Sequence, residues 1–404
     1  MLSGGDLDLQ LALTLLLALF EWESGSVEAC FMHITGADAL SLTSHDQISK
    51  TSSGLRLLGS WAEMRTQKNG HKLPFRPLDE ELIGDRTTQT MILSKRIAGH
   101  SIPSLSFLLT EAYCLRNRLV LQSCMNLNGI DSESTLRICR AWYSRAFDFT
   151  FEEYPETEVH STLSLEDLLF RLSTTRWLLE EWRAALPAKA LPSPLQTSVI
   201  YTLRPTRLHP APVLQLTRFI FQECGAAIQF LRYQIGCFLS SRDILDSYLT
   251  RSRPPLPNEP LGPEATLILS IIESLDPSED SLHYTFDEGI LWILNVLPVC
   301  IPDIRVTSYL LDIILPRLEH YGSFKPLLFD LKTRQMLVGI HSEIEAGRLP
   351  LLYDPNVLIT DDIALNNNRL GSKAAVLGRT LEGGSFQDVV ELPPVAVSRG
   401  TFIQ

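Results

Sequence analysis

Residues 9–22 read LQLALTLLLALFEW, and residues 23–42 continue with ESGSVEACFMHITGADALSL. The first stretch is apolar on nearly every side of a helix, and such a helix is typical of a buried position. We therefore predict two consecutive helices, the first at the centre of a large helical domain, with Leu16 and Leu17 in the core. Three polar residues interrupt the first stretch, namely Gln10, Thr14 and Glu21.

The composition indicates a folded protein without a targeting segment. With 404 residues, 45% of them apolar and 20% charged, the chain can bury a sizeable core in one large domain. The apolar run near the start is too short to span a bilayer, Asp6 and Asp8 precede it, and Lys50 is the first basic residue. We therefore expect no secretion signal, no membrane segment and an intracellular, soluble protein.

Cysteines and net charge narrow the class further. No C-x-x-C pair occurs, so the cysteines are expected to be reduced thiols in the core. The net charge is −12 and no run of basic residues offsets it, which argues against direct DNA binding. The cysteines are Cys30, Cys114, Cys124, Cys139, Cys224, Cys237 and Cys300.

Helical periodicity recurs along the chain, while strand alternation is hardly visible. The clearest helix is residues 164–186, where Ser164 and Asp167 form a capping box and Pro187 marks the end. Further helices are predicted at residues 104–126, 131–149, 213–249, 264–275, 287–300, 304–318 and 324–346.

The breaks between these helices define the expected organisation. A polar connector covers residues 43–105 with a short helix at 55–64, and Pro-rich breaks cover residues 187–212 and 251–263. From residue 349 the helical pattern fails, so 349–404 is expected to be a loosely packed tail with at most short extended pieces. We predict an all-α fold, with residues 1–348 forming one large helical domain of antiparallel helix hairpins around buried central helices.

The search for catalytic chemistry finds little. Asp361 and Asp362 resemble the paired acids that hold magnesium in isoprenoid synthases, but Leu365 replaces the third acid. Short motifs of this kind match often by chance, so a solvated turn is the preferred interpretation. Five acids between residues 276 and 288 are interpreted as loop and first-turn acids of the helix near Asp287. His33 is interpreted as a hydrogen-bonded structural histidine. No catalytic, cofactor-binding or metal-ligating residue is predicted, and no cofactor.

An H-x-x-G-A element follows the early apolar helix, a middle helix ends in EEWRAALP at residues 180–187, and DEGILWIL follows at residues 287–294. These three phrases, in this order, resemble the regulatory (middle homology) domain of fungal zinc-cluster transcription factors. The residues that carry the resemblance are His33, Gly36, Ala37, Trp182, Leu186, Pro187 and Trp292.

This resemblance implies a nuclear protein that regulates transcription, often of a metabolic gene cluster. Protein partners or self-association, and a small-molecule effector, would be expected. The six-cysteine zinc cluster and basic linker of that family do not occur in the sequence, so direct DNA binding and zinc binding are not expected of this chain.

Two other classes of function stay open. One is an all-helical enzyme of the terpenoid-synthase or tailoring type, and the other is a non-catalytic helical scaffold. Paired acids lining a deep cavity would favour the enzyme, whereas a filled core with an exposed apolar face would favour the regulator or the scaffold.

Overall fold

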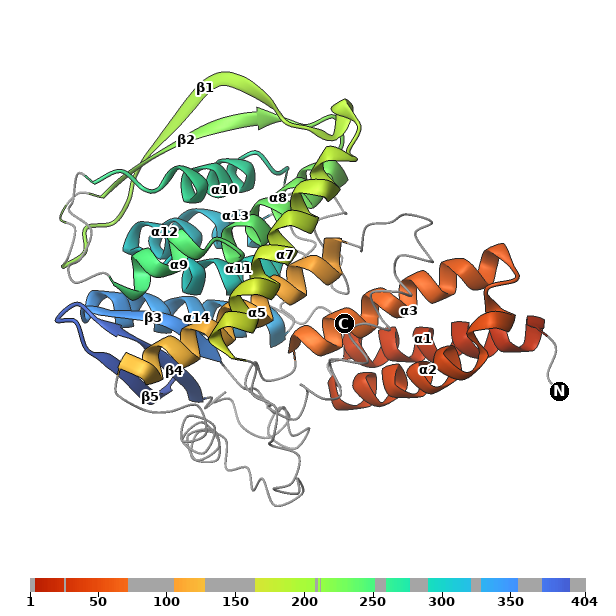
Figure 1. Cartoon of the computed structure of the whole chain (residues 1–404). Coiled ribbons are helices and arrows are strands. Elements are labelled where there is room, and N and C mark those ends of the chain that lie inside the picture. Colours follow the sequence, from red (N-terminus) through yellow and green to blue (C-terminus); the bar gives the residue numbers. More distant parts are fainter. Residues whose placement is uncertain are drawn as a thin grey trace, which may run out of the picture.

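The computed structural model of the chain describes residues 4–24, 27–71, 105–127, 164–207, 210, 212–250, 259–276, 290–320, 328–354 and 373–392. These residues are mostly helical, as predicted (Figure 1). They also form two small antiparallel sheets, one of two strands and one of three. The strictly all-α prediction is therefore wrong.

The N-terminal helices form a separate layer on one side of the molecule (Figure 1). They are α1 (Gly4–Ser24), α2 (Val27–Ile48) and α3 (Ser52–His71), so α3 is much longer than the predicted short helix. The turn before α3 is tied to α1, because Asp8 accepts hydrogen bonds from Thr51 (2.6 Å) and Ser53 (3.1 Å). This layer joins the rest of the protein where α3 packs against α5 (Leu105–Leu127).

Helix α1 is not central, which corrects the first prediction. Among the described elements, α2 and α3 form its main contacts, so one face is buried and the opposite face, including Leu16 and Leu17, is exposed. Leucines all round a helix favour burial but do not supply neighbours to cover every side. The buried apolar side chains are Leu7, Leu11, Leu15 and Ala18, which pack in two small clusters with residues of α2 and α3.

The two faces of α1 predict opposite responses to the same substitution. Leu11→Asp places a carboxylate in a fully buried position and is expected to lower the stability by several kcal/mol. Leu16→Asp places it in solvent and is expected to change stability by less than about 0.5 kcal/mol. Thermal melting followed by circular dichroism compares the two variants, and equal losses would contradict this orientation of α1.

Helix α5 is buried on most of its surface. It packs against α7 (Leu165–Ala184), α8 (Cys224–Leu239) and the C-terminal sheet, and its side chains from Leu105 to Met125 are largely buried. One of its two arginines is buried: Arg116 donates hydrogen bonds to the carbonyl oxygens of Leu351 (3.1 Å) and Val299 (3.2 Å). The structure thus has the predicted buried central helix, but at α5 rather than at α1.

The other helices of the main body agree well with the sequence pattern. Ser164 caps α7 as predicted, because its hydroxyl accepts a hydrogen bond from the backbone N–H of Asp167 (3.1 Å). The predicted helix 131–149 lies outside the described residues. The remaining elements are α9 (Arg242–Leu249), α10 (Pro263–Glu273), α11 (Ile290–Cys300), α12 (Ile304–Tyr309), the π-helical turn η5 (Leu310–Ile314), α13 (Leu315–His320) and α14 (Leu328–Glu345).

A β-hairpin replaces parts of a predicted connector and a predicted helix. After the short helix η3 (Ala188–Ala190), β1 (Ser193–Thr202) lies in the Pro-rich break, and it pairs with β2 (Val213–Ile220), which was predicted to begin the helix 213–249. Leu214 and Leu216 of β2 are buried while their neighbours are exposed, which is the alternation of a half-buried strand. The hairpin arches over α10 (Figure 1).

The predicted loose tail contributes a packed sheet. Strands β3 (Arg348–Asp354), β4 (Lys373–Thr380) and β5 (Ser385–Glu391) are antiparallel in the order β3-β4-β5, and they lie beside α14 (Figure 1). The middle strand β4 is buried from Ala374 to Arg379. At Gly378 the strands approach so closely that a Cβ atom would lie 2.0 Å from the carbonyl oxygen of Leu349. The expectation of a loosely packed tail is therefore wrong for these strands.

Candidate functional site

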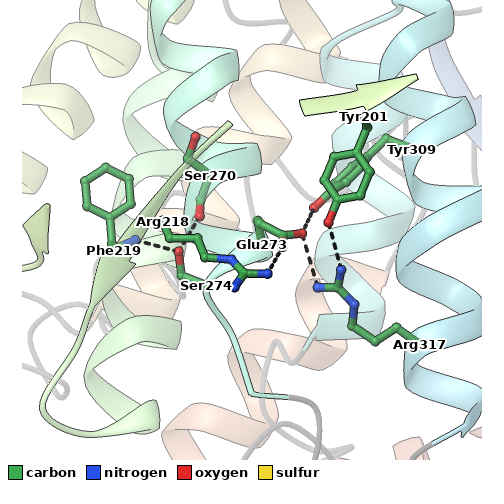
Figure 2. A network of polar contacts seen from close by, with 8 residues as sticks. All are labelled: Tyr201, Arg218, Phe219, Ser270, Glu273, Ser274, Tyr309 and Arg317. Carbon is green, nitrogen blue, oxygen red and sulfur yellow. Dashed lines mark hydrogen bonds and ion pairs between the residues drawn. The ribbon is translucent and has the colours of Figure 1, made fainter. Parts of the chain in front are cut away.

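The β1–β2 hairpin is fastened to α10 by serine side chains. The backbone N–H of Thr217 donates to the hydroxyl of Ser270 (3.0 Å). The backbone N–H of Phe219 donates to the hydroxyl of Ser274 (2.8 Å) (Figure 2). A two-stranded hairpin leaves its outer edge unpaired, and hydroxyls one helical turn apart satisfy alternate N–H groups of that edge. The serines thereby position the hairpin directly above the end of α10.

Glu273 lies between these two serines and gathers four side chains around it (Figure 2). Its fully buried carboxylate accepts hydrogen bonds from Arg218 of β2 (2.9 Å) and Tyr309 of α12 (2.8 Å). Arg317 of α13 forms an ion pair with it at 3.1 Å and also donates to the hydroxyl of Tyr201 at 3.0 Å. We call these five residues the Glu273 cluster.

The electrostatics of the cluster stabilise the ionised form of Glu273 and the protonated forms of the two tyrosines. Burial alone would raise the pKa of Glu273, but the hydrogen bonds from Tyr309 and Arg218 and the charge of Arg317 outweigh it, so the pKa is lowered. Burial and the nearby carboxylate raise the pKa values of Tyr309 and Tyr201. The carboxylate therefore stays ionised and both tyrosines stay protonated.

This arrangement is suited to holding elements together rather than to catalysis. A general base needs a pKa near the working pH and an oxygen that can reach a substrate, whereas Glu273 has a lowered pKa and both oxygens engaged. Its partners come from β1, β2, α12 and α13. The Glu273 cluster thus connects the hairpin with three helices.

The residues that carry the family resemblance do not form one site. Ala37 is buried against α1 and α3, and a Cβ atom on Gly36 would lie 3.9 Å from Thr14 of α1. Trp182 stacks on Tyr233 of α8 at 5.9 Å between ring centroids, and Trp292 contacts Tyr113 of α5 edge-on at 5.8 Å. The remaining three are the half-buried His33 and Leu186 and the exposed Pro187.

Most of the acidic residues that the sequence offered as metal-site candidates lie outside the described residues. Asp361, Asp362 and Asp287 lie outside the described residues, and Asp276 is exposed just after α10. Within the described residues, no three His, Cys, Asp or Glu side chains are grouped so that they could hold a metal ion. Among the helices described above, none is both long and apolar enough to cross a membrane.

Sequence reasoning missed the Glu273 cluster, although a signal for it exists. Glu273 stands alone in the apolar run ILSIIESL and Arg317 stands alone in IILPRL. A lone charge inside an otherwise apolar helix face is a candidate for a buried, paired group. Arg218 gave no such signal because it lies in the stretch that was predicted to be helical.

The buried thiols are chemically quiet. Burial raises the pKa of Cys124 to about 12, even though Arg379 and Arg116 lie nearby, and burial likewise raises the pKa values of Cys237 and Cys300. A thiol is nucleophilic only as the thiolate, so these cysteines act as small apolar side chains.

The exposed face of α1 is a second candidate site, of a different kind. Five large apolar side chains lie along it, and they define what we call the α1 outer face. A row of this length on one helix is unusual on a protein surface and is typical of interaction sites. The residues and their exposed fractions are Leu9 (60%), Leu13 (51%), Leu16 (61%), Leu17 (48%) and Phe20 (66%).

Comparison of the chain with protein-family models, with curated proteins and with solved structures found no match.

Proposed function

We propose that the chain is a non-catalytic regulatory domain that acts through protein contacts, of the type found in fungal zinc-cluster transcription factors. The observation that carries the proposal is the α1 outer face, because apolar side chains in solvent lower the free energy when a partner covers them. The nuclear location and the control of metabolic genes rest on the resemblance of the three sequence phrases.

The chemistry of the described residues supports a binding role over an enzymatic one. The Glu273 cluster uses its charged groups on one another, and the buried thiols are protonated. The net charge of −12 disfavours contact with the phosphates of DNA, so the chain would act on promoters through another protein.

A tethered transcription assay tests this function. The full chain is fused to an unrelated DNA-binding domain in a fungal host, and we expect a severalfold change in transcription of a reporter carrying the matching sites. The double variant Leu13→Gln/Leu16→Gln should lose most of this change, since it removes apolar area from the α1 outer face. Trp177→Gln, which removes an exposed tryptophan from α7, is the matched control and should behave as the intact chain. An unchanged reporter at equal protein level would refute the regulatory role.

A further inference from the structure

The spacing of the α1 outer face matches one ligand shape. Leu9, Leu13, Leu16 and Phe20 are separated by four, three and four residues, which is the heptad spacing of a helix–helix seam. Leu17 widens this row on one side. The exposed row lies opposite the row that packs on α2 and α3, so a helix could dock along it without disturbing the packing of α1. A helix of this size offers a contact about 30 Å long.

The neighbouring helix extends the same surface. Helices α1 and α2 are consecutive and antiparallel, and Gly36 of α2 lies against Thr14 of α1. One turn earlier in α2, Met32 is 69% exposed, and because the two helices are antiparallel it lies toward the end of α1 that carries Leu17 and Phe20. A flexible, exposed methionine is well suited to pack against a docked side chain.

All the Asp, Glu, Lys and Arg residues of α1 and α2 are acidic, whereas α3, which packs on the buried side of α1, carries Arg56, Arg65 and Lys68. No lysine or arginine precedes Lys50, so α1 and α2 contain only acidic charges at neutral pH. Two of these acids flank the α1 outer face in sequence, Asp6 before it and Glu21 after it. The acids of this part of the chain are Asp6, Asp8, Glu21, Glu23, Glu28, Asp38 and Asp46.

We propose that the α1 outer face binds an amphipathic helix of a partner protein whose leucine-type row is flanked by lysine and arginine. Opposite charges on the two sides favour the encounter and the register. A second copy of this chain would bring acids against acids, and an anionic membrane would repel the same acids, whereas membrane-surface helices are rich in lysine and arginine. The inference rests on the proposed function, because it specifies the partner of that interaction domain.

A peptide-binding measurement on the purified full chain tests the proposal. The probe is a fluorescent synthetic helix of about 20 residues with leucine at the a and d positions of each heptad and lysine at the e and g positions. We expect saturable binding by fluorescence anisotropy that weakens as salt is raised. A second peptide with glutamate in place of lysine should bind at least about tenfold more weakly.

Variants locate the binding site. Leu13→Gln/Leu16→Gln should weaken binding of the lysine peptide about tenfold or more, because each leucine loses its contact with the probe. Phe170→Gln and Trp177→Gln remove exposed aromatic side chains from α7 and should leave binding unchanged, which excludes a general attraction to exposed apolar residues. Melting curves that coincide with that of the intact chain would show that all variants are folded.

Three results would overturn the proposal. The first is equal or absent binding of the two peptides. The second is a dimer in sedimentation velocity that dissociates in the Leu13→Gln/Leu16→Gln variant, which would assign the face to a second copy. The third is binding to phosphatidylserine vesicles that this variant abolishes. No promoter takes part in these measurements, so helix binding and transcriptional activity can fail independently of each other.

Discussion

Deletion of residues 371–404 is expected to leave the chain unfolded or aggregated at 25 °C. The deletion removes β4 and β5, and with them four consecutive buried side chains from Ala374 to Leu377. Burial of a valine or leucine contributes about 1.5–3 kcal/mol each, and the loss also leaves β3 without a partner strand. The free energy of unfolding of a typical protein is about 5–15 kcal/mol in total, so this loss is large. The loosely packed tail expected from the sequence would imply the opposite, that such a deletion costs little stability.

Circular dichroism and thermal melting of the truncated chain test this result. A shorter deletion of residues 393–404 leaves β3, β4 and β5 intact and is the matched control. A cooperative transition for the longer deletion within a few degrees of the intact chain would show that the C-terminal sheet is peripheral.

Glu273→Ala is expected to destabilise the protein by about 3–5 kcal/mol. The substitution leaves the Tyr309 hydroxyl and the partly buried Arg317 without their shared acceptor, and breaking a buried ion pair from one side costs this much. Glu273→Gln keeps the shape but not the charge, so a smaller loss is expected. Urea unfolding measures both, and Glu264→Gln, an exposed acid in the first turn of α10, is the control that should change little.

The lowered pKa of Glu273 also predicts how the stability difference between the intact chain and Glu273→Gln depends on pH. The pKa of Glu273 is lower in the folded chain than its ordinary value of 4.5, so the folded state favours the ionised form. Its contribution to stability is complete above about pH 4.5 and is lost as the pH falls through the folded pKa. The difference in the free energy of unfolding between the intact chain and Glu273→Gln should therefore become smaller at acidic pH. A difference independent of pH would mean that the charge of Glu273 does not stabilise the fold.

The helices could be predicted from sequence where their caps and periodicity agree, as in α7. The sequence-based prediction was wrong where burial, or the choice between helix and strand, depends on which other elements pack against the segment. Helices α1 and α5 are both rich in leucine, but of the two only α5 is buried on most of its surface. The leucines of β2 fit both the helical repeat and the two-residue repeat of a strand. The short apolar run of β4 is likewise compatible with a helix or a strand. Local patterns specify a conformation better than they specify what covers it.

The candidate sites show the same division. The Glu273 cluster joins residues from position 201 to position 317, and no local motif encodes such a set. The residues of the α1 outer face were all recognised as apolar, but they were assigned to the core. The structure instead places them on the surface, because α2 and α3, the main neighbours of α1 in the described part of the chain, cover only its other face.

The contact between α5 and the last sheet has a consequence during synthesis. Ser385 of β5 donates to the carbonyl oxygen of Cys124, 261 residues earlier, and Arg116 reaches β3 across 235 residues. At a translation rate of roughly 5–20 residues per second, synthesis of the 261 residues from α5 to β5 takes on the order of 13–50 s. During that interval a leucine-rich helix lacks part of its cover. Newly made chains should therefore depend on chaperones, and a ribosome that stalls before β4 should release a product prone to aggregation.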